Sequence, residues 1–207
     1  MRFMKLSNLP DVYFIRHGQT DWNAEGRYQG QKDIPLNDVG RGQAEGNGAL
    51  LRSLLEQGER DPQKFGWYAS PMDRTRDTME RVRSCFDVDL PQVQLDRRLI
   101  EISFGIHEGS LATEYATTGL VRRDKRDESF WYYKPENGED YEELSARVRS
   151  FLMALTKPGI VVSHGGVARA FRHLIEGMDR QSAIRWPTPQ DVILHFSGGQ
   201  LKIISAS

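Results

Sequence analysis

The chain has 207 residues, enough for one domain with a full core, and 38% hydrophobic and 28% charged residues are typical of a folded protein. A formal net charge of −1 argues against a surface devoted to nucleic acid or anionic lipid. A single cysteine excludes an intramolecular disulfide and a thiolate metal cluster, and no run of about 20 apolar residues predicts a membrane span. We therefore expect a cytoplasmic, single-domain protein over residues 1–207.

Three short β-prone runs, residues 11–15, 67–69 and 160–162, each stop at a polar loop. The loops begin with Arg16-His17-Gly18, Ser70-Pro71 and Ser163-His164-Gly165-Gly166. Ligands of open α/β sheets bind outside the carboxyl ends of the strands. The three loops are therefore expected at one edge of a sheet.

Apolar residues at helical spacing predict four helices. The helices are expected over residues 38–57, after Ser70, after Asp140 and after Gly166. The second has Ser70 as its predicted N-cap and Pro71 at its first position, and residues 191–196 and 201–204 predict a closing hairpin. Alternating strands and helices favour an α/β fold, a three-layer α/β/α sandwich around a mostly parallel mixed sheet.

Residues 110–138 are less regular and contain a basic tract at 122–126. They are interpreted either as an insertion that covers a substrate or as a solvated helix followed by a surface loop. The basic tract has two interpretations as well. It would select a second acidic group of a substrate, or it is simply solvated.

Arg74 lies in the first turn of its predicted helix, where the positive end of the macrodipole disfavours a cation. Either Asp73 compensates as a capping-box partner of Ser70, or a bound phosphate uses both the helix N–H groups and the guanidinium. If Arg74 meets the loops of His17 and His164, the result is a positively charged site with imidazoles, which suits a phosphoryl dianion.

The order of these motifs resembles the histidine phosphatase superfamily (phosphoglycerate-mutase-like), whose signature is the RHG tripeptide of residues 16–18. The resemblance spans nearly the whole chain. It rests on residues 16–23, 26–30, 33–36, Gly40, Ser70-Pro71, Arg74-Thr75, Leu99, Glu101, Phe104-Gly105, Glu108-Gly109, Gly138-Glu139 and 163–166. Two departures are His107, where many relatives have tryptophan, and Asp140, where serine is usual.

The resemblance implies that His17 attacks phosphorus and is transiently phosphorylated. It also implies that the phosphoryl oxygens are held by Arg16, Arg74 and His164. Positive neighbours should lower the pKa of His17 below about 6.5, which keeps the imidazole nucleophilic at neutral pH. Glu101 is the implied proton donor to the leaving group, with Glu108 as the fallback.

Further substrate contacts are expected from Gly18, Thr20, Asn23, Gln29 and Gly165. Thr20 would equally serve as a cap of the following turn. No cofactor and no metal are expected, because the histidines lack HxxxH or His-carboxylate spacing. The expected partner is a small phosphorylated metabolite and neither nucleic acid nor membrane, and the oligomeric state stays open.

Three functions fit these residues. The first is a phosphatase, in which water takes the phosphoryl group from His17. The second is a cofactor-dependent phosphoglycerate mutase, which must exclude water, and the third is a catalytically silent phospho-ligand binding module. The short region between Glu108 and Gly138 offers little lid and favours the phosphatase. The intact set of candidate catalytic residues disfavours the silent module.

Overall fold

A computed structural model of the protein describes residues 9–113 and 125–205. Its described strands form one sheet in the order β3-β2-β4-β1-β5-β6. The strands are β1 (Val12–Arg16), β2 (Gly66–Ala69), β3 (Val93–Leu95), β4 (Gly159–Ser163), β5 (Val192–Ser197) and β6 (Gln200–Ser205). Strands β3, β2, β4 and β1 run parallel, whereas β5 is antiparallel to β1 and to β6. The predicted mostly parallel mixed sheet is confirmed.

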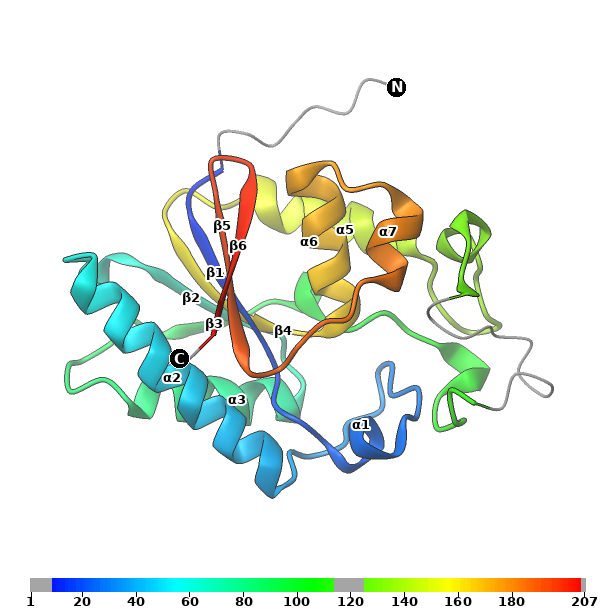
Figure 1. Ribbon diagram of the computed structural model, residues 1–207, viewed down its shortest axis with the longest axis horizontal. Helices are drawn as coiled ribbons and strands as arrows, with labels where there is room; N and C mark the ends of the chain where they lie inside the picture. The colour runs from blue at the N-terminus through cyan, green and yellow to red at the C-terminus, as the bar shows by residue number, and fades with distance from the viewer. Residues whose placement is uncertain (1–8, 114–124, 206–207) are drawn as a thin grey trace.

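Helices cover both faces of this sheet (Figure 1). The α-helices are α1 (Asp21–Glu25), α2 (Asp38–Gln57), α3 (Asp73–Ser84), α5 (Tyr141–Met153), α6 (Gly165–Glu176) and α7 (Arg180–Arg185). Short 3₁₀ helices are η1 (Pro62–Lys64), η2 (Arg97–Leu99), η3 (Gly105–His107) and η5 (Glu128–Trp131). Helices α2 and α3 lie on one face, and α5, α6 and α7 lie on the other. The three-layer α/β/α sandwich is thus the observed architecture.

Side chains of β1 point alternately into two cores, because successive strand residues face opposite sides of a sheet. Phe14 packs toward α5 and α6, with its ring 5.0 Å from that of Phe171. Ile15 joins the second core, which contains Leu51 of α2 and Met79 of α3. All five side chains are essentially inaccessible to solvent. Each contributes about 1.5–3 kcal/mol by burial, which fixes the register of β1 and the position of its carboxyl end.

The start of α3 differs from the prediction. The helix begins at Asp73 rather than at Pro71, its N-cap is Met72, and no side chain of its own caps it. The predicted cap at Ser70 is wrong, because the Ser70 hydroxyl is bonded instead to the ring of His164 at 2.8 Å. The carboxylate of Asp33, from a distant loop, accepts the Asp73 N–H at 3.0 Å and takes over the capping role.

The predicted insertion at residues 110–138 lies partly outside the described residues, since 114–124 and most of the basic tract are not described. Its described part contains η5, which is anchored to α5. Trp131 is fully buried with its ring 5.0 Å from that of Tyr141, and its indole N–H donates to Glu142 at 2.8 Å. A role in covering substrate stays a prediction. Among the described helices, none combines the length and the apolar character that crossing a membrane requires.

Candidate active site

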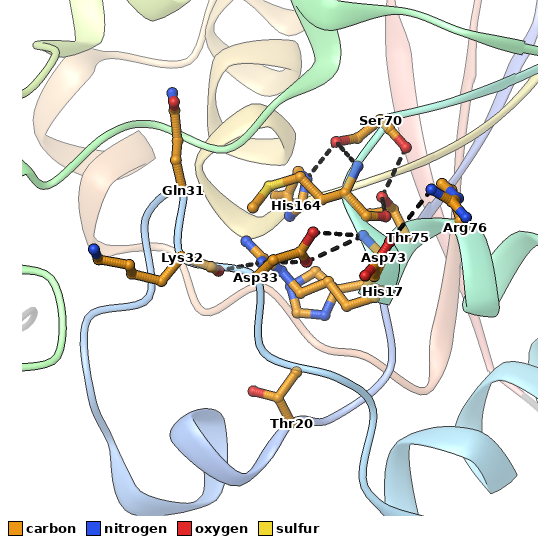
Figure 2. A network of polar contacts seen from close by, with 12 residues as sticks. His17, Thr20, Gln31, Lys32, Asp33, Ser70, Asp73, Thr75, Arg76 and His164 are labelled. Atoms are coloured by element: carbon orange, nitrogen blue, oxygen red, sulfur yellow. Dashed lines mark hydrogen bonds and ion pairs between the residues drawn. The ribbon is translucent and has the colours of Figure 1, made fainter.

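Strands β1, β2 and β4 end at the same edge of the sheet and bring His17, Ser70 and His164 together. Arg16 pairs with Ser163, and Ala69 pairs with Val162, so the next residues of all three strands emerge side by side. The rings of His17 and His164 meet edge to face with centroids 5.2 Å apart. Figure 2 shows this cluster together with the Asp33 loop. The predicted meeting of the three loops is confirmed.

The ring of His17 is buried and held by its own loop. Nδ1 lies 2.8 Å from the carbonyl of Gly18, and because a carbonyl only accepts, Nδ1 carries the proton and Nε2 the lone pair. The backbone is fixed as well, since the His17 N–H donates to Ser163 and the Gly18 N–H to Thr78. A side chain at Gly18 would meet the carbonyl of Gly40 at 2.1 Å, so only glycine fits. Nε2 of the imidazole, with its lone pair, is therefore held in a fixed orientation.

Both histidines are neutral at physiological pH. Burial holds the pKa of His17 well below 6.5, the Arg74 and Arg16 charges add to this, and the Gly18 hydrogen bond opposes it. Burial also holds the pKa of His164 well below 6.5, followed by the charge of Arg74 and the proximity of His17. The lowered pKa predicted for His17 is confirmed. The order of the causes differs from the prediction, because burial lowers the pKa of His17 more than its positive neighbours do.

Acid is expected to destabilise the fold through these two histidines. Below pH 6.5 these two histidines are protonated in the unfolded chain, whereas in the folded protein they stay neutral because their pKa values are lowered. The free energy of unfolding therefore falls by up to about 1.4 kcal/mol per pH unit for each ring. Urea unfolding between pH 5 and pH 7.5 measures the slope. The same titration of His17→Gln should give a shallower slope. An unchanged slope in that variant would contradict the assignment.

Arg74 on α3 is fully buried and is held by the loop that Asp33 belongs to. Its terminal nitrogens donate to the carbonyls of Lys32 and Gly30 at 2.8 and 2.9 Å, and the Asp33 carboxylate lies 3.7 Å away. Nε of Arg74 and Nδ1 of His164 are buried at this site and have no hydrogen-bond partner among the described residues. An anion next to His17 would supply an acceptor for the N–H of Arg74 Nε.

Glu101 follows η2 and reaches the amino end of α6. Its carboxylate accepts the Gly166 N–H at 3.0 and 3.1 Å and the Ile102 N–H at 2.9 Å. Its carbonyl accepts from Arg147, which anchors the segment to α5. Glu108 has a different role. Its carboxylate accepts the backbone N–H groups of Gln31 and Phe104 and so connects the two loops to which these residues belong. Glu101, which lines the same cavity as His17, is the candidate acid.

A cavity of about 270 Å³ opens in front of His17. Of the predicted site residues, it is lined by Arg16, His17, Asn23, Gln29, Arg74, Glu101 and Gly165. Gly18, Thr20 and His164 are not among the described lining residues. Thr20 is buried as the N-cap of α1 and accepts the Asn23 N–H at 3.2 Å, which is the second of the two roles expected for it. The ring of His164 contacts that of His17 edge to face and is bonded to the Ser70 hydroxyl.

The sequence did not predict a role for the segment before β5. Two of its residues, Thr188 and Gln190, form hydrogen bonds with residues of the site. The amide of Gln190 donates to the carbonyl of His17 at 2.9 Å and to the side chain of Asn23 at 3.1 Å. The carbonyl of Thr188 accepts from Arg16 at 2.5 Å. A signal existed, because β5 is antiparallel and its amino end must therefore lie where the parallel strands have their carboxyl ends. Arg27, Tyr28 and Arg169, which also line the cavity, were missed as well, whereas Arg126, another lining residue, belongs to the basic tract for which substrate contact was one of the two interpretations.

A buried, neutral imidazole beside two arginines, at the carboxyl edge of an open α/β sheet, is an arrangement suited to binding a phosphoryl group. Residues 12–205 match the model of the histidine phosphatase superfamily (branch 1), and the chain belongs to that superfamily. Its relatives in this superfamily are phosphatases and phosphoglycerate mutases.

Relatives of both kinds resemble this chain closely enough to align over most of its length. It is 30% identical over 176 residues to a metal-independent phosphoserine phosphatase of Arabidopsis thaliana, covering 79% of this chain and 68% of that one. It is 31% identical over 160 residues to a probable phosphoglycerate mutase, GpmB, of Salmonella paratyphi C, covering 74% and 69%. A mycobacterial glucosyl-3-phosphoglycerate phosphatase shares the fold with a TM-score of 0.74 at 22% identity, covering 96% and 100%.

Proposed function

We propose that this protein is a metal-independent phosphatase that hydrolyses a small phosphorylated metabolite in the cytoplasm through a phosphohistidine intermediate on His17. One observation carries the proposal. The ring of His17 is neutral, its Nδ1 proton is tied to Gly18, and it lines a cavity together with Arg16 and Arg74. This is the state that nucleophilic attack on phosphorus requires.

The first step forms a bond from Nε2 of His17 to phosphorus and breaks the bond to the ester oxygen, which leaves with the proton of Glu101. Arg16 and Arg74 balance the charge on the equatorial oxygens. In the second step, water attacks the phosphohistidine and gives its proton to the Glu101 carboxylate. Inorganic phosphate leaves and His17 is restored. No cofactor enters the proposed cycle.

The unpartnered Nε of Arg74 supports an anionic substrate. A buried donor or acceptor without a partner costs about 1–3 kcal/mol. Nε of Arg74 carries this cost in the described structure. A phosphoryl group in the cavity would accept from Arg74, and it offers further oxygens to the neighbouring donors. Binding of phosphate esters would thus recover free energy that the fold gives up.

A phosphoglycerate mutase is the alternative, since GpmB relatives carry that description. A mutase must keep water from the phosphohistidine until the phosphoryl group returns to a sugar acid. The short stretch between Glu108 and Gly138 favours hydrolysis instead. A silent binding module, the third possibility, would have no need of a neutral His17 beside a carboxylate.

The proposal is tested with p-nitrophenyl phosphate and 3-phosphoglycerate, with EDTA present throughout. Both inorganic phosphate and 2-phosphoglycerate are measured. We expect phosphate release that EDTA does not reduce. Isomer formation without phosphate release would establish the mutase instead, and loss of phosphate release on adding EDTA would overturn the metal-independent mechanism.

A further inference from the structure

The segment just before β5 holds both residues of the Arg16-His17 pair. The carbonyl of Thr188 accepts from Arg16 at 2.5 Å, and the side-chain amide of Gln190 donates to the carbonyl of His17 at 2.9 Å. Thr188 and Gln190 also line the cavity in front of His17. A side chain from the carboxyl-terminal part of the chain therefore lies against the loop that carries the proposed nucleophile.

Gln190 is itself fixed through its backbone. Its carbonyl accepts from the side-chain amide of Asn47 on α2 at 2.8 Å, and Asn47 is only 2% exposed. A buried amide that lost this acceptor would be left without a partner, which is unfavourable. Gln190 is therefore held against α2, and its side chain reaches from there to the loop after β1.

The hydrogen bonds around Asn23 determine which way its amide points. The backbone N–H of Thr20 can only donate, so the Asn23 atom 3.3 Å from it is the oxygen, Oδ1. The same oxygen lies 3.1 Å from the Gln190 amide, and the carbonyl of His17 lies 2.9 Å from that amide. Because both of these oxygens are acceptors, the Gln190 group between them is the NH₂ group. The backbone thus fixes the orientation of both amides.

Asn23 is left with a donor to offer to a ligand. Its oxygen accepts from Thr20 and from Gln190, which uses both lone pairs. Its Nδ2 forms no hydrogen bond with any of the described residues, and Asn23 lines the same cavity as His17. An NH₂ group suits an ionised phosphoryl oxygen, which only accepts, whereas an amide oxygen in its place would repel it.

The orientation of Asn23 depends on Gln190 more than on Thr20. The last side-chain torsion of asparagine is broad and roughly two-fold, so only its hydrogen bonds select between the two orientations of the amide. The bond from Thr20, at 3.3 Å, is longer than is usual for N–H···O, whereas the bond from Gln190, at 3.1 Å, is within the usual range. Loss of the Gln190 donor would therefore leave the Asn23 amide poorly oriented.

We propose that Gln190 is a positioning residue of the active site, which orients the Asn23 amide so that its NH₂ group donates to the phosphoryl group of the substrate. The inference rests on the proposed function, because the acceptor is the phosphoryl group that His17 attacks. Both N–H groups of Gln190 are used on His17 and Asn23, so Gln190 has no donor left for the phosphoryl group itself. Its effect on the substrate passes through Asn23.

The test is a double-mutant cycle with Asn23→Ala and Gln190→Met, since methionine keeps the length of the glutamine side chain and removes its donors. With p-nitrophenyl phosphate, each single substitution should lower kcat/KM by about tenfold to a hundredfold, the range for a hydrogen bond to a charged group. In the Gln190→Met background, Asn23→Ala should then cost no more than about twofold. Gln190→Glu should behave like Gln190→Met, because a carboxylate has no N–H to donate. Losses that multiply in the double variants would overturn the proposal.

Gln43→Met is the matched control. The Gln43 side chain accepts the Gln19 N–H at 2.9 Å, so it supports the same loop, but it does not line the described cavity. In this background Asn23→Ala should keep its full cost, because support of the loop alone does not orient the amide. If Asn23→Ala lost its effect in Gln43→Met as well, a general loosening of the loop would explain the cycle, and the proposal would be overturned.

A spectroscopic measurement tests the same proposal without turnover. The side-chain NH₂ signals of Asn23, assigned by their absence in Asn23→Ala, are followed in ¹H–¹⁵N spectra while inorganic phosphate is added. We expect a downfield proton shift in the wild type and in Gln43→Met, and none in Gln190→Met.

If no ester is hydrolysed, the phosphatase fails, and the Asn23 signals decide the role of Gln190 alone. The expected pattern of shifts would support that role without the reaction. Signals that respond equally in the wild type and in Gln190→Met, or that do not respond to phosphate in the wild type, would overturn it.

Discussion

Phosphate release is expected to fall by about 10⁴-fold to 10⁶-fold when His17 is replaced by alanine, the range found when an enzyme loses its covalent nucleophile. The reason is geometric as well as chemical. The ring is fixed by Gly18 and kept neutral by its burial between arginines, so no neighbouring group replaces it. Phosphate release from p-nitrophenyl phosphate measures the loss.

The matched control is His195→Ala, which removes a histidine of β5 that does not line the described cavity. It should leave phosphate release within a few-fold of the wild type. Quenched reactions of the wild type should also contain a protein species heavier by one phosphoryl group, and His17→Ala should lack it. Undiminished release by His17→Ala would rule out the phosphohistidine mechanism.

The fold was largely predictable because its signals are local. Residues 11–15 and 160–162 are apolar runs that read as buried strands, and β1 and β4 occupy nearly the same positions. Helix α2 has the predicted bounds, 38–57. A topological rule then places the ends of parallel strands at one edge, so the meeting of His17 with His164 also followed from the sequence.

The features of the fold and the site that the sequence did not predict depend on contacts between residues far apart in the chain. Ser70 satisfies the local rule for a helix cap, yet its hydroxyl bonds to His164, 94 positions away, and Asp33 caps α3 instead. Gln190 bonds to the carbonyl of His17 across 173 positions. Arg169 looks like an ordinary helical arginine in the sequence. Only the folded chain shows that it is buried beside the cavity.

Glu101→Gln is expected to lower kcat for alkyl phosphates such as glycerol 3-phosphate by about 10²-fold to 10⁴-fold, the usual contribution of a general acid. The glutamine oxygen still accepts the Gly166 N–H, so the loop keeps its anchor while the transferable proton is lost. An alkoxide leaves poorly without a proton, whereas p-nitrophenolate leaves readily. The first step with p-nitrophenyl phosphate should therefore slow far less, and a burst of p-nitrophenol should persist in the variant.

Glu108→Gln is the matched control, since Glu108 also accepts backbone N–H groups but does not line the described cavity. It should slow both substrates by the same small factor, because a loosened loop does not distinguish leaving groups. A loss that depends on the leaving group in Glu108→Gln, and not in Glu101→Gln, would transfer the role of acid to Glu108. Equal losses for both esters in Glu101→Gln would show that this carboxylate only anchors α6. The dependence on the leaving group thus separates proton donation from positioning, which a loss of activity alone does not.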